Sequence, residues 1–100
     1  IQLIKSNLGK TRYFDLKLVL KKLYKAEIRN VLVEGGDDLS CSFFKKKLFN
    51  EFYLFKSPKK LSKSVAYKDF NCFKYLSQNY KYKKKVNTLL GKDSITLYKR

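Results

Sequence analysis

The chain has 100 residues and carries 24 basic against 8 acidic side chains, a formal net charge of +16. Its hydrophobic content of 44% and aromatic content of 16% suffice for the core of one domain and argue against intrinsic disorder. No apolar run approaches the roughly 20 residues that a membrane-spanning helix needs, and no signal-peptide pattern opens the sequence.

The first third of the sequence alternates short apolar runs with an amphipathic segment. Residues 1–4 are typical of a strand, and residues 5–13 of a loop. Asp15 is the predicted N-cap of a helix over residues 16–26, where leucine and valine recur at spacing i, i+3, i+4, i+7. Residues 28–33 end in a continuous apolar run, which favours a strand buried on both faces.

The rest of the sequence predicts a further helix and three strands. Asp37 or Asp38 can cap a helix over residues 39–48, and residues 51–58 are typical of another buried strand. Residues 59–80 are less regular, whereas residues 82–99 predict two antiparallel strands around a turn at residues 91–94. The order predicts one α/β domain over residues 1–100, with a mainly parallel sheet flanked by helices and a C-terminal antiparallel hairpin.

Residues that are absent or scarce narrow the chemistry. The sequence has no histidine, which excludes Ser-His-Asp and Cys-His catalytic sites and histidine-containing zinc sites. Cys41 and Cys72 lie far apart without CxxC spacing, so we interpret them as two reduced thiols of a cytoplasmic protein. Any reaction is therefore expected to depend on binding, on orientation and on an organic cofactor.

The junction Glu34-Gly35-Gly36 is the strongest candidate site. It follows the apolar run of residues 31–33 and precedes a predicted helix. A glycine without Cβ lets a phosphate approach the backbone, and a helix N-terminus offers free N–H groups to it. Two glycines are equally typical of a tight strand-to-helix turn. Glu34 can likewise be a substrate contact or a carboxylate that caps the loop.

The wider pattern resembles the carboxy-terminal reductase domain of bifunctional riboflavin-biosynthesis proteins. In that family a strand ends in Glu-Gly-Gly, a leucine follows three residues later, a helix leads to an Asp-Glu turn, and the next strand ends in Pro-Lys-Leu. The matching positions here are Glu34-Gly35-Gly36, Leu39, Phe43-Phe44, Leu48-Phe49-Asn50-Glu51 and Pro58-Lys59-Lys60-Leu61. The terminal LLGKDSITLY is similar to the last hairpin of the family.

The resemblance implies a partial dihydrofolate-reductase-like fold, with this chain as the C-terminal half of a reductase domain. It also implies NADPH-dependent reduction of 5-amino-6-(5-phosphoribosylamino)uracil to the ribityl form, in a cytoplasmic homodimer. Gly35 and Gly36 are then expected beside the NADPH pyrophosphate, and Glu34 near the ribose of the substrate. No residue is expected to act as a nucleophile, and no metal is expected.

Three departures from the family pattern bear on these expectations. Glu27 stands where the family usually has a glycine at the end of the preceding helix. Asn50 replaces the aspartate of the Asp-Glu turn. Asp37 and Asp38 suit a helix N-terminus, but they would repel a pyrophosphate if both pointed into its site.

Two other functions stay open. The net positive charge reflects either AT-rich coding, which favours lysine, or attraction to phosphates. Residues 80–86, YKYKKKV, interleave aromatic and basic side chains, as a nucleic-acid-binding module would. The period of two between Tyr80 and Tyr82 fits one face of a strand equally well. A non-catalytic relative of the reductases is the other alternative.

Overall fold

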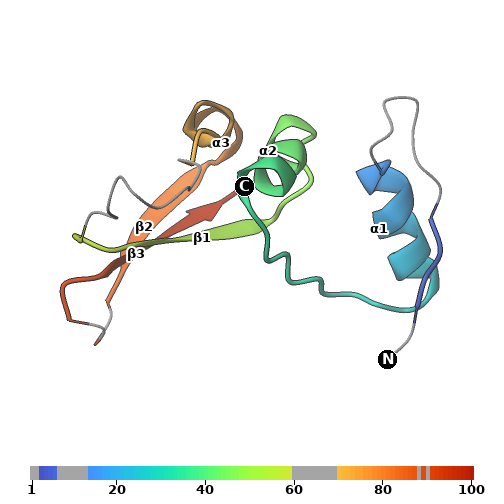
Figure 1. Cartoon of the computed structure of the whole chain (residues 1–100), viewed down its shortest axis with the longest axis horizontal. Helices are drawn as coiled ribbons and strands as arrows, with labels where there is room; N and C mark the ends of the chain where they lie inside the picture. Colours follow the sequence, from blue (N-terminus) through green and yellow to red (C-terminus); the bar gives the residue numbers. More distant parts are fainter. Residues whose placement is uncertain (1–2, 7–13, 60–69, 88, 90) are drawn as a thin grey trace, which may run out of the picture. The chain divides into compact units, whose positions relative to one another are not determined.

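In a computed structural model, residues 3–6, 14–59, 70–87, 89 and 91–100 are described. Over these residues the elements follow the order α1, α2, β1, α3, β2, β3 (Figure 1). The chain divides into two compact units, Ile1–Glu34 and Gly35–Arg100. None of the helices in the described residues has the length and apolar character needed to span a membrane.

The first unit contains the helix α1, Leu16–Lys25. Its N-cap is Asp15, as predicted, and the Asp15 carboxylate accepts hydrogen bonds from the backbone N–H groups of Lys17 and Leu18 at 3.0 and 3.3 Å. These bonds satisfy two of the donors that a helix start leaves without intrahelical partners. The predicted start is therefore confirmed, and the helix ends one residue earlier than expected.

The end of α1 explains why a glycine suits the position of Glu27. Glu27 has a φ of 65°, in the left-handed region. Its N–H donates to the carbonyl of Tyr24 at 3.0 Å, and the N–H of Ile28 donates to the carbonyl of Leu23 at 3.1 Å. This pair of bonds defines a Schellman motif, whose left-handed residue is most often glycine because a Cβ is disfavoured there.

The run at residues 28–33 is not a strand in the structure. Val31, Leu32 and Val33 have exposed fractions of 45%, 85% and 40%, so the run is not buried on both faces. Leu3 and Ile4, the described part of the first predicted strand, are not a strand either. An apolar run forms a strand only where a neighbour pairs with its backbone, and the local sequence cannot supply that neighbour.

The sheet lies in the second unit and is antiparallel throughout. It consists of β1 (Glu51–Lys56), β2 (Tyr82–Val86) and β3 (Ser94–Lys99), in the order β1-β3-β2. The strand after residue 50 and the C-terminal hairpin are confirmed, and Gly91 in the hairpin connection has a φ of 68°. The predicted mainly parallel, partial dihydrofolate-reductase-like sheet is wrong for the described residues, because β1 pairs with the last strand.

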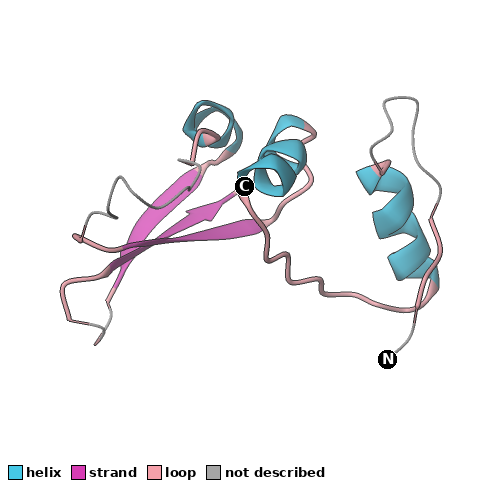
Figure 2. Ribbon diagram, viewed as in Figure 1, coloured by secondary structure: helices cyan, strands magenta, loops and turns pink. Residues whose placement is uncertain are grey.

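The helices α2 (Asp37–Lys45) and α3 (Phe73–Asn79) cover one face of this sheet (Figure 2). Phe44 of α2 is the centre of the core, with its ring edge-on to those of Phe49 and Phe52 at 5.0 and 4.9 Å between centroids. Leu76 of α3 packs into the same core. The sequence did not predict α3, because only one turn of it carries a buried apolar side chain.

Candidate functional site

Gly36 stands at the start of α2 without a structural reason to be glycine. It is the N-cap of the helix, with φ −72° and ψ −174°, a conformation open to any residue. Among the residues that the structure describes, a Cβ built at Gly36 would meet no atom within 4 Å. Neither packing among the described residues nor the backbone conformation therefore requires glycine here, although glycine is a common N-cap residue.

Gly35 differs from its neighbour in this respect. A Cβ at Gly35 would lie 2.6 Å from Cδ2 and 3.3 Å from Cβ of Leu39, both closer than ordinary contacts. Leu39 lies in the first turn of α2, so the absence of a side chain at Gly35 lets the chain enter the helix closely. The turn interpretation thus accounts for Gly35 and not for Gly36.

The N-terminus of α2 can accept an anion. Gly36 offers no side-chain cap, and the first intrahelical bond runs from the N–H of Ser40 to the carbonyl of Gly36 at 3.1 Å. The N–H groups of the first turn have no intrahelical acceptors, and the helix dipole adds positive potential there. An open, side-chain-free N-cap with these donors fits a phosphate or pyrophosphate.

Asp37 does not stand in front of this helix N-terminus. Its Oδ1 accepts a hydrogen bond from the backbone N–H of Asn71 at 2.9 Å. The same oxygen lies 3.7 Å from Sγ of Cys41, one turn further along α2. The carboxylate therefore lies beside the second turn and the start of α3. Of the two aspartates that could repel a phosphate, Asp37 is engaged elsewhere.

Glu34 is the last residue of the first unit, directly before the two glycines in the chain. Its side chain is exposed, and within the described ranges it makes no hydrogen bond or ion pair. A carboxylate that capped the loop would show such a bond, so the capping interpretation gains no support. Glu34 and Gly36 are brought together here only by their positions in the sequence.

The structure corrects the interpretation of the cysteines. Cys41 of α2 and Cys72, the N-cap of α3, form a disulfide, with their Cα atoms 5.2 Å apart. The two cysteines are 31 positions apart in the sequence, and the packing of α2 against α3 brings them together. No spacing motif could have indicated this pair, because the contact depends on the packing of α2 against α3.

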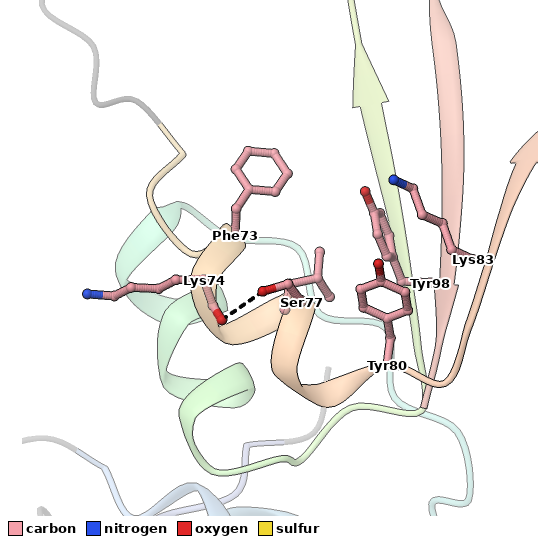
Figure 3. A pocket seen from close by; sticks show the side chains of 7 residues that line it. Phe73, Lys74, Ser77, Tyr80, Lys83 and Tyr98 are labelled. Carbon is pink, nitrogen blue, oxygen red and sulfur yellow. Dashed lines mark hydrogen bonds between the residues drawn. The ribbon is translucent and has the colours of Figure 1, made fainter.

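A separate pocket of about 300 Å³ lies between α3 and the sheet (Figure 3). Its lining comprises Phe73, Lys74, Leu76, Ser77, Tyr80, Lys83 and Tyr98, and includes neither glycine of the candidate site. Tyr80 packs edge-on against Tyr98, with 4.9 Å between ring centroids, whereas Tyr82 is 49% exposed. Of the two tyrosines in the YKYKKKV segment, Tyr80 therefore packs against the core, whereas Tyr82 is open to solvent.

The sequence matches known proteins over most of its length. A profile of the family described as the RibD C-terminal domain matches residues 2–67. The riboflavin biosynthesis protein RibD of Aquifex aeolicus (strain VF5) is 33% identical over 87 residues, which are 87% of this chain and 24% of that protein. The protein of the same name from Buchnera aphidicola subsp. Baizongia pistaciae (strain Bp) is 34% identical over 93 residues, 92% of this chain and 24% of that protein. The chain thus spans about a quarter of the length of these relatives. No solved structure matches it significantly.

Proposed function

The chain belongs to the family of the RibD C-terminal domain, and on that premise we propose that it acts in riboflavin biosynthesis as part of an NADPH-dependent reductase. The proposed substrate is 5-amino-6-(5-phosphoribosylamino)uracil, whose ribosyl chain becomes a ribityl chain. A cytoplasmic location belongs to the same proposal. The observation that carries it is the open glycine N-cap of α2, because a dinucleotide is a ligand that such a site suits.

In this proposal the chain's own residues bind and orient. The first-turn N–H groups of α2 would donate to the pyrophosphate, and Gly36 would leave room for its oxygens. Bound NADPH would supply the hydride. The exposed carboxylate of Glu34 would accept a hydrogen bond from a ribose hydroxyl of the substrate and hold the sugar in position for reaction.

NADPH titration of Gly36→Val tests the placement of the cofactor. The Cβ of the new side chain meets no atom of the described residues within 4 Å and needs no unusual φ, so the fold should persist. The dissociation constant for NADPH should rise about tenfold or more, the equivalent of one lost charge-assisted hydrogen bond. Gly35→Ala is the matched contrast, because its Cβ meets Leu39 and should lower thermal stability.

Three results would overturn parts of the proposal. A folded Gly36→Val protein that titrates like the wild type would remove the pyrophosphate from this site. Wild-type protein that binds NADPH without turning over the pyrimidine would be a non-catalytic relative. Retention of single-stranded DNA near roughly 0.15 M salt, without NADPH binding, would favour the nucleic-acid-binding alternative.

We also propose that the protein is a homodimer that pairs through the sheet. Tyr53 and Phe55 of β1 project from the same face of that strand and are 47% and 66% exposed. On that face their partners in β3 are Leu97, which is already buried, and Ile95, which is half-buried. Burial of these rings against a second copy would remove apolar surface from water.

A further inference from the structure

The disulfide between Cys41 and Cys72 joins the helix that carries the glycine site to the start of α3. We propose that this pair is a reversible dithiol–disulfide site, whose oxidation state controls the N-terminus of α2 and so the binding of the dinucleotide. The coupling to the dinucleotide rests on the proposed function above, whereas the redox chemistry of the pair does not. If the protein is cytoplasmic, a permanent disulfide would be unusual there, and a transient one would be the expected kind.

The surroundings of the sulfur atoms favour the reduced form. Oδ1 of Asp37 lies 2.9 Å from Sγ of Cys72, and the backbone carbonyl oxygen of Asp37 lies 3.3 Å from it. A disulfide sulfur has no hydrogen to donate, so neither contact is a hydrogen bond in the oxidised protein. A Cys72 thiol at the same place could donate to Asp37, and a disulfide whose reduced form is stabilised is easier to reduce.

The two sulfur atoms differ in their access to a reductant. Cys72 has no exposed surface and lies in the core, whereas Cys41 is half-buried. A thiolate from an external dithiol would therefore attack Sγ of Cys41. The S–S bond breaks, its electron pair passes to Sγ of Cys72, and that sulfur takes up a proton beside Asp37. The second thiol of the reductant then attacks the mixed disulfide. This step releases Cys41 as a thiol, and the reductant leaves as an oxidised, cyclic disulfide.

Reduction should loosen the glycine site without unfolding the unit. Cys41 lies in the second turn of α2, so the disulfide restrains the helix close to its N-terminus, where Asp37 follows Gly36 directly. The other end of α3 is tied to α2 separately, because Nδ2 of Asn79 donates to the carbonyl of Phe44 at 2.9 Å. This second tie and the aromatic core remain after reduction, while the N-terminus of α2 loses its covalent restraint.

The redox chemistry is tested on the full-length protein, equilibrated in glutathione buffers of graded ratio and alkylated with a maleimide. Intact mass should show a cooperative change between no modified cysteine and two. Asp37→Asn should shift the midpoint towards the disulfide by about three- to tenfold in the equilibrium constant, the effect of weakening one hydrogen bond. Asp38→Asn removes the same charge from the same turn, outside the cluster of Asp37, Cys41 and Cys72, and should shift it little.

Three results would overturn the redox site. One is a folded protein whose disulfide stays intact in dithiothreitol at about 10 mM, which is a strongly reducing condition. Another is a protein that keeps two free thiols in oxidised glutathione. The third is a pair of thiols protected only when Zn²⁺ is added, because two thiolates and a carboxylate also form a zinc donor set.

NADPH titration of the oxidised and reduced proteins tests the coupling. The dissociation constant should be at least about fivefold higher in the reduced form, within the usual range of coupling between sites. Cys41→Ser should bind like the reduced protein in either buffer. Equal affinities in the two states would refute the coupling and leave the cofactor proposal standing. Absence of NADPH binding in both states would refute the cofactor proposal and this coupling, while the alkylation result would still decide the redox site.

Discussion

Replacement of Glu34 by glutamine separates a role in the reaction from a role in the fold. The change keeps the size of the side chain and removes its charge. Because Glu34 is exposed and has no hydrogen bond or ion pair among the described residues, the free energy of unfolding should change by no more than about 0.5 kcal/mol. Loss of one charge-assisted hydrogen bond to the ribose costs roughly 1.5–3 kcal/mol, which is on the order of a 10- to 150-fold fall in kcat/KM.

The assay is steady-state reduction of the pyrimidine substrate by full-length protein, followed by NADPH absorbance, beside thermal melting. The NADPH dissociation constant should stay close to the wild-type value, because Glu34 is not part of α2. Glu27→Gln is the matched control, since Glu27 is a second exposed glutamate in the same unit. If Glu34→Gln and Glu27→Gln both keep wild-type kcat/KM, Glu34 does not contact the substrate.

Three further predictions concern stability and assembly. Glu27→Gly relieves a left-handed non-glycine residue at φ 65° and should stabilise the first unit by about 1 kcal/mol in urea unfolding; a loss of stability would contradict the Schellman account. The Lys99 ammonium, 2.9 Å from Glu51, lowers the pKa of that carboxyl below 4.5, so the advantage of wild type over Glu51→Gln in melting temperature should persist at neutral pH and vanish as the pH falls below about 4.5. A difference in melting temperature that widens in acid would refute a stabilising ion pair between Lys99 and Glu51. Light scattering at micromolar concentration should give a dimer, and Phe55→Lys should give a monomer if the face that carries Tyr53 and Phe55 is the interface; a monomeric wild type would exclude the dimer.

Elements whose causes lie within a few residues could be predicted from the sequence. The Asp15 cap and the apolar stripe of α1 act over one or two helical turns. The C-terminal hairpin depends on a short connection through Gly91, whose positive φ a glycine adopts without strain. The Glu34-Gly35-Gly36 junction indicated the family through residue types and their spacing, which do not depend on whether the preceding run forms a strand.

Only the tertiary structure decided the features that join distant segments. The sequence of β1 shows that it is a strand, but not that its partner is β3, which lies some forty residues later and runs antiparallel to it. The run Val31-Leu32-Val33 has strand-like side chains, yet backbone pairing requires a neighbour that no local pattern provides. The disulfide follows from the packing of α2 against α3, and that packing also turns Asp37 towards Cys72. Even the two adjacent glycines differ only in three dimensions, because Leu39 occupies the space beside Gly35, whereas no described residue occupies the space beside Gly36.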